Sequence, residues 1–100
     1  MTQEIERMKT IWNYIEIEIR YIPDYLKSYK ASFGQLAHIE VQAKCPLPIT
    51  ETGYKSIFLS FGEVEEAGGA LALVKAMLEK SAQSKDWQEY EKDQQQINLF

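Results

Sequence analysis

The side chains in this sequence best suited to chemistry are one histidine and three acidic or phenolic groups that follow it. His38 is the only histidine, and Glu40 stands two positions further on; Glu51 and Tyr54 come later. Histidine titrates near neutral pH, and a carboxylate can hold or accept its proton, so such a group could carry acid–base chemistry. The spacing assembles no serine–histidine–acid arrangement. A small enzyme or ligand-binding domain centred on these four residues is therefore an alternative prediction, not the leading one.

Metal and thiol chemistry have weaker support. Glu16 and Glu18 share one face of a predicted strand, and with Glu40 they would offer oxygen ligands to a cation. Carboxylates spaced this way usually face solvent, so we expect no metal and no cofactor. Cys45 is the single cysteine and cannot form an internal disulfide. We interpret it as a small apolar residue in a reducing cytoplasm.

The end of the chain, "QQQINLF", suggests recognition and not catalysis. Ile97, Leu99 and Phe100 follow a polar and charged run, whereas chain ends are usually polar. Two adjacent large apolar side chains make a compact anchor for a partner's pocket. The end of the chain either packs on its own domain or is displayed to a partner.

A second candidate for recognition is the stretch "PLPITETGYKS" at residues 46–56. One interpretation is a well-defined hairpin connection in which the hydroxyl groups satisfy turn backbone atoms. The other is a recognition loop, because binding groups favour loops. The residues of that loop would be Pro48, Thr50, Glu51, Thr52, Gly53 and Tyr54.

Length and charge limit the remaining classes of function. One hundred residues fit a single domain. The net charge is −4, and the second half of the chain carries five basic against nine acidic residues. No basic stripe is visible, so we do not expect direct nucleic-acid binding. No apolar run is long enough for a membrane helix or a secretory signal, which favours a cytoplasmic protein.

Three strands are expected from the pattern of residues. The stretch "YIEIEIRYI" at residues 14–22 alternates isoleucine with charged residues, which is the signature of a half-buried strand. Alternation and β-branched or aromatic content predict two more strands at residues 36–44 and 54–61. The first ten residues are read as a short helix or a loose segment. Residues 23–34 are read as a short helix or an aromatic-rich loop.

Helical periodicity dominates the second half. Apolar residues at three- and four-residue steps predict one main helix over residues 63–83, with Gly68 and Gly69 letting it lie close on the sheet. Ser84 can cap a polar last helix. The expected fold is α+β: a three-stranded antiparallel sheet with one main helix packed on it and a C-terminal polar helix. The domain would span residues 1–83, a helical spacer 84–95 and a tail 96–100.

The tail resembles the pentapeptide with which bacterial proteins bind the DNA polymerase III β sliding clamp. That motif is glutamine, an aliphatic residue, serine or aspartate, leucine and phenylalanine. Four positions match, and Asn98 departs mildly as a different small polar residue. The resemblance implies that Leu99 and Phe100 fill the apolar pocket of the clamp while Gln96 bonds at its rim. The residues concerned are Gln96, Ile97, Asn98, Leu99 and Phe100.

Residues 34–100 also resemble a group of short bacterial proteins of uncharacterised function that occur with plasmids and phages. The resemblance rests on "GQLAHIEV", "PLPITETGYKS", "VEEAGG" and "QINLF". Many members have histidine where this chain has Ile57, which weakens a catalytic or metal role for that stretch. The group supplies no activity to carry over.

These observations favour a non-enzymatic adaptor that docks on the sliding clamp through residues 96–100. It would join or modulate replication or repair on behalf of a mobile element, and loop 46–56 would engage a second protein partner that the sequence does not identify. Besides the enzyme or ligand-binding alternative, a plain interaction protein that forms a homodimer through its sheet remains open, because a small sheet leaves two free edges.

Overall fold

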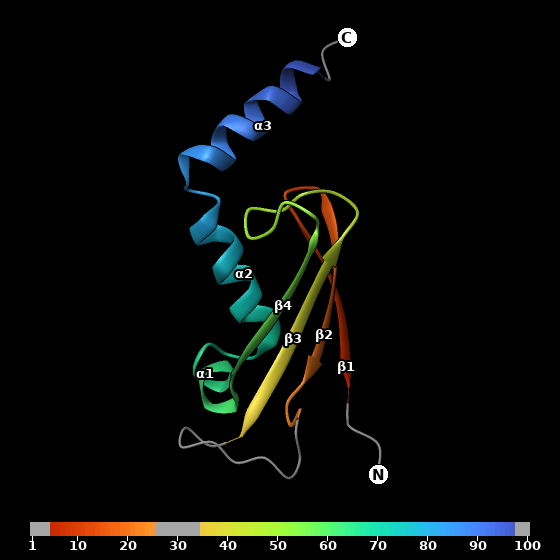
Figure 1. Cartoon of the computed structure of the whole chain (residues 1–100), viewed down its shortest axis with the longest axis vertical. Coiled ribbons are helices and arrows are strands. Elements are labelled where there is room, and N and C mark those ends of the chain that lie inside the picture. Colours follow the sequence, from red (N-terminus) through yellow and green to blue (C-terminus); the bar gives the residue numbers. More distant parts are fainter. Residues whose placement is uncertain (1–4, 26–34, 98–100) are drawn as a thin grey trace.

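The fold is built on one antiparallel sheet with helices on one of its faces (Figure 1). The structure is a computed structural model and describes residues 5–25 and 35–97. The sheet has four strands in the order β1-β2-β3-β4, so each strand pairs with its neighbour along the chain. Their bounds are β1 Glu6–Trp12, β2 Ile15–Ile22, β3 Leu36–Ala43 and β4 Tyr54–Ser60. The α+β class and the antiparallel sheet are confirmed, and the expected count of three strands is wrong.

The additional strand is β1, most of which lies in the first ten residues, where the sequence predicts a short helix or a loose segment. It pairs with β2 along its whole length, from Glu6 opposite Tyr21 to Trp12 opposite Ile15. The two-residue connection has positive φ angles at Asn13 (50°) and Tyr14 (67°), as a tight type I′ hairpin requires. Tyrosine rarely adopts such a φ. The sequence has Tyr14 where the usual Asn-Gly signal of this hairpin has glycine, so the signal is missing.

The sheet has one face covered by helices and one open face. On β2 and β3, Ile17, Ile19, Ile39 and Val41 are completely or almost completely buried on the covered face. Arg20 and Glu40 stand opposite each other on the open face. The alternation expected for residues 14–22 and 36–44 is therefore confirmed.

The expected single helix over residues 63–83 is two helices, α1 Phe61–Glu66 and α2 Ala70–Ser81. Gly68 and Gly69 have φ angles of 97° and 110°, a region that other residues rarely adopt. An added Cβ would meet nothing within 4 Å at Gly69, so close packing on the sheet does not explain the pair. The glycines break the helix and turn the chain.

The core lies between the covered face and the two helices. Val64 of α1 and Val74 and Leu78 of α2 are fully buried with the isoleucines of the sheet. A capping box fixes the start of α1: Ser60 Oγ accepts from the Glu63 amide at 3.2 Å, and Glu63 Oε2 accepts from the Ser60 amide at 3.1 Å. Sequence periodicity thus identified Val64, Val74 and Leu78 as buried although it missed the break.

The last helix, α3 Lys85–Ile97, extends away from the sheet toward the C-terminal end (Figure 1). The predicted cap is confirmed, because Ser84 Oγ accepts from the Trp87 amide at 3.2 Å. Within residues 5–25 and 35–97, no helix combines the length and apolar character needed to span a bilayer.

Candidate functional site

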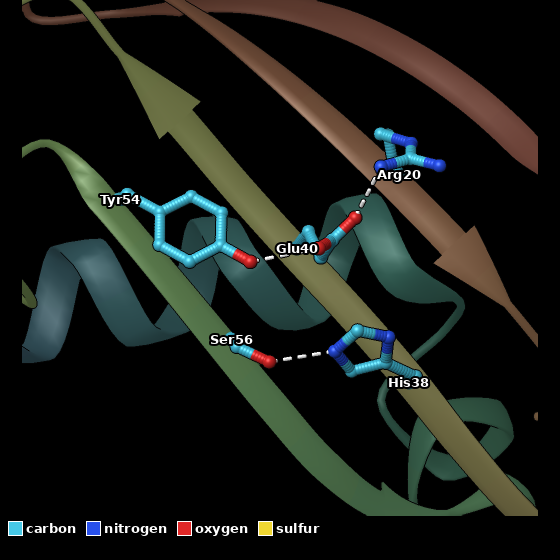
Figure 2. A network of polar contacts seen from close by, with 5 residues as sticks. All are labelled: Arg20, His38, Glu40, Tyr54 and Ser56. Atoms are coloured by element: carbon cyan, nitrogen blue, oxygen red, sulfur yellow. Dashed lines mark hydrogen bonds and ion pairs between the residues drawn. The ribbon is translucent and has the colours of Figure 1, made fainter.

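The open face of the sheet carries a network of polar side chains from three strands (Figure 2). Glu40 lies at its centre on β3. Arg20 Nη1 on β2 donates to Glu40 Oε1 at 2.6 Å, and the Tyr54 hydroxyl on β4 donates to Glu40 Oε2 at 2.7 Å. The hydrogen bond to the Glu40 carboxylate is the main cause of a raised Tyr54 pKa. The carboxylate thus has both oxygens engaged.

His38 lies beside this network, two residues before Glu40 on the same strand. Its Nε2 is 2.6 Å from the Ser56 Oγ of β4, and only 6% of the residue is exposed. Burial is the main cause that lowers the pKa of His38; nearby Glu40 acts in the opposite direction, and Arg20 lowers the pKa further. The imidazole is therefore neutral at pH 7.

Aromatic rings cover the histidine. The Phe58 ring stacks on the His38 ring, with centroids 4.3 Å apart and planes at 14°. The Tyr25 ring meets both edge-on, at 4.8 Å from His38 and 5.2 Å from Phe58. Phe58 itself is 54% exposed, so its outer surface faces solvent. The open face therefore presents the exposed aromatic surface of Phe58 beside the charged pair of Arg20 and Glu40.

This geometry gives weak support to catalysis. A serine–histidine–acid relay needs a carboxylate at the second ring nitrogen of the histidine. Within the described part of the chain, His38 Nδ1 has no hydrogen-bond partner, and Glu40 binds Arg20 and Tyr54 instead. Glu51 is exposed in its loop, outside the network of Figure 2. No group of three metal-ligating side chains occurs among the residues described.

The two threonine side chains of loop 46–56 form their hydrogen bonds within the loop. The Thr50 and Thr52 hydroxyls both donate to the Tyr54 carbonyl, at 2.8 and 3.2 Å, and Thr52 Oγ1 accepts from the Tyr54 amide. Leu47 and Thr50 exchange backbone hydrogen bonds at 2.8 and 3.0 Å. Such bonds are those of a well-defined connection, the first of the two interpretations of this stretch.

The same loop has an apolar side that borders a groove. Leu47 is 2% exposed and belongs to the core, whereas Pro48 is half-buried and Glu51 exposed. Between this loop and the start of α3 lies an open groove of about 550 Å³. Its walls include Pro46, Pro48, Ile49, Trp87 and Tyr90, with Glu51 and Asp86 among the lining residues.

The C-terminal motif falls at the end of α3. Gln96 and Ile97 are the last residues of that helix, and Asn98, Leu99 and Phe100 lie outside the described residues. Near its start, α3 is held by Trp87, which is 7% exposed and packs against the Trp12 ring at 6.1 Å. The side chains of residues 92–94 are exposed.

Sequence reasoning missed Arg20, Ser56 and Phe58 as members of the open-face cluster. Each is a cross-strand neighbour of β3: Arg20 and Ser56 flank Glu40, and Phe58 stands opposite His38. The only signal in the sequence is their position on the outward face of predicted strands. That signal identifies them only when the register between strands is known.

The fold defines a class of small α+β domain, a four-stranded antiparallel meander with two short helices over one face and a third helix that projects beyond the sheet. The family model described as KlcB third domain matches residues 5–87, so the chain belongs to this family. The match covers the sheet, α1 and α2 and ends at Trp87. Comparison with curated proteins and with solved structures finds no match.

The lowered pKa of His38 predicts a stability that depends on pH. Because the folded state holds the imidazole neutral, the unfolded chain takes up its proton first as the pH falls through about 6.5. We expect the free energy of unfolding to fall from pH 7.5 to pH 5.5, by at most about 1.4 kcal/mol per pH unit. Urea unfolding at each pH measures it.

The variant His38→Gln is the control, since His38 is the only histidine of the chain. It should flatten the profile between pH 7.5 and 6, where the carboxylates stay ionised. An unchanged slope in the variant would contradict the assignment.

Proposed function

We propose that this chain is a non-enzymatic adaptor that docks on the bacterial DNA polymerase III β sliding clamp through residues 96–100. The observation that carries the proposal is the direction of α3, which leads its last turn away from the sheet (Figure 1). An apolar anchor at the end of a projecting helix is accessible to a pocket on another protein.

Among the side chains of α3 that the structure describes, those that hold it to the domain lie in its first half. The Trp87 ring packs on Trp12 and lies 5.1 Å from the Tyr90 ring. Asn13 Nδ2 donates to Glu91 Oε2 at 2.6 Å. From Glu91 to Ile97 the helix advances about 9 Å at 1.5 Å per residue. This advance supports a motif that is displayed to a partner and not packed on the domain.

The resemblance assigns the roles within the motif. Leu99 and Phe100 would enter the apolar pocket of the clamp, and Gln96 would bond at the rim. Helix ends fray readily, so Gln96 and Ile97 can leave the last turn at small cost when they bind. An adaptor of this kind would act in the cytoplasm, where it would join or modulate replication or repair for a mobile element.

An adaptor also needs a surface for its second partner. The groove between loop 46–51 and α3 supports this part of the proposal, because Pro48, Trp87 and Tyr90 give it apolar and aromatic walls. The groove lies at the anchored start of α3 and the motif at its other end, so the groove and the motif can each bind a partner at the same time.

The test is a titration of purified clamp with the full chain and with the double variant Leu99→Ala/Phe100→Ala. Removal of both anchors should weaken binding at least about 30-fold, since a single hot-spot side chain contributes about 2 kcal/mol or more. The matched control Gln94→Ala/Gln95→Ala changes the spacer and should bind like the unmodified chain. No binding of the unmodified chain at about 100 µM, near the weak limit for a specific contact, would contradict the proposal. Equal binding by the double variant would also contradict it.

A further inference from the structure

The two edges of the sheet differ in how well they resist pairing with another strand. Edge strands are usually protected by charged side chains, proline or bulges. β1 carries Glu6, Arg7 and Lys9, all exposed. β4 has the sequence YKSIFLS, with a single charge at Lys55 and two exposed aromatic residues, Tyr54 (46%) and Phe58 (54%).

The outer side of β4 has no strand beside it within the described residues, since β4 pairs only with β3. α2 packs against β2 in the middle of the sheet, and Figure 2 shows it behind the sheet as seen from the open face. α1 continues directly from the end of β4 and touches β3 as well. The helices therefore lie over the covered face and not along the outer side of β4.

We propose that β4 pairs antiparallel with β4 of a second copy, forming a homodimer with one continuous eight-stranded sheet. The register that pairs all seven residues of β4 has its two-fold axis at Ile57. In this register each large side chain of the open face stands opposite a small one. Tyr54 faces Ser60 of the second copy, and Phe58 faces Ser56 of the second copy.

The two Phe58 rings are diagonal neighbours in this register, at the roughly 7–8 Å separation over which aromatic side chains still interact. On the covered face Lys55 stands opposite Leu59 of the second copy, so its apolar stem covers that leucine and its charge reaches solvent. No two like charges are opposite each other. The corresponding register of β1 would place Lys9 directly opposite Lys9, which is unfavourable.

The inference uses β4 and the open face and is independent of the C-terminal tail. Its test is sedimentation equilibrium of the full chain at about 200 µM, a concentration that detects even a weak dimer. We expect a mass twice the 11.6 kDa of one chain. The variant Phe58→Lys sets two ammonium groups about 8 Å apart across the axis and should sediment as a monomer. The matched variant Ile11→Lys adds the same charge at an exposed position of β1 and should remain dimeric.

A monomeric unmodified chain would overturn the inference, as would a dimeric Phe58→Lys variant or a monomeric Ile11→Lys variant that keeps its circular dichroism spectrum. Hydrogen exchange gives a readout without mutation. The β4 amides that do not bond to β3 should exchange more slowly as the chain concentration rises, while the outer amides of β1 should not change. Slowing at β1 instead would also overturn it.

Discussion

Gly53→Ala is expected to destabilise the domain by about 3 kcal/mol and to lower Tm by roughly 12–24 °C. Gly53 has a φ of +83°, which costs other residues about 1–2 kcal/mol. An added Cβ would also lie 2.6 Å from the Ala43 carbonyl oxygen and 2.9 Å from that of Cys45. Both are backbone atoms, so neither can rotate away, and such overpacking costs about 1–3 kcal/mol more.

The position of Gly53 explains why the substitution should weaken the fold beyond the turn itself. The Gly53 carbonyl accepts from the Ala43 amide at 2.7 Å, at the place where β3 ends and β4 is about to begin. Displacing this residue would disturb the start of the β3–β4 pairing. Thermal unfolding followed by circular dichroism measures the shift.

Gly62→Ala is the matched control. Gly62 lies inside α1, and an added Cβ there meets nothing within 4 Å. It should be neutral or stabilising by up to about 1 kcal/mol, because alanine is the better helix former. A Gly53→Ala variant as stable as the unmodified chain would refute the steric argument.

Trp87→Ala is expected to release α3 from the domain. Trp87 supplies an apolar contact between this helix and the sheet through its packing on Trp12, and its ring also lies against Tyr90 of the same helix. Truncating a buried tryptophan costs about 3–5 kcal/mol. A polar helix of 13 residues is marginal without such an anchor, so α3 should unravel. The core of the sheet, α1 and α2 does not include Trp87 and should stay folded.

Far-UV circular dichroism should show the loss of helix, since α3 contributes 13 helical residues against 6 and 12 in α1 and α2. Hydrogen exchange should localise the change to α3. Gln88→Ala, one position along on an exposed side chain, is the control and should keep the helix. If α3 stayed protected in Trp87→Ala, the anchor would have to lie elsewhere.

Three of the four strands could be predicted because their alternation matches their burial. Ile17 and Ile19 on β2, and Ile39 and Val41 on β3, are the residues that the pattern places inward. β1 escaped prediction because its seven residues include three charges and its hairpin has tyrosine where glycine is usual. Pairing with β2 determines its conformation, and pairing is not a local property.

The break between α1 and α2 was missed for a different reason. Val64, Val74 and Leu78 keep to helical spacing across the break, so the pattern alone could not distinguish one helix from two. The positive φ angles at Gly68 and Gly69 decided the outcome. Ala67, which the single-helix pattern placed on the buried stripe, is exposed.

The open-face cluster could be predicted only in part. His38 and Glu40 were recognised because of their residue types, and the structure brings Glu40 to Tyr54 as well. Arg20 and Phe58 are separated from these residues by 18 to 20 positions, and only the strand register brings them together. The register between β3 and β4 depends in turn on loop 44–53, whose backbone geometry no short-range pattern specifies.

The described contacts that hold α3 to the domain lie in its first half, so the peptide after Glu91 can be replaced without removing them. The ring contacts and the side-chain hydrogen bond described for α3 involve residues up to Glu91, and the side chains of residues 92–94 are exposed. Most of α3 also lies beyond the residues matched by the family model, which end at Trp87. The contacts described for α3 therefore do not depend on the residues that follow Glu91. If residues 96–100 bind a partner as proposed, exchanging this terminal peptide would change the partner and leave the described contacts of α3 in place.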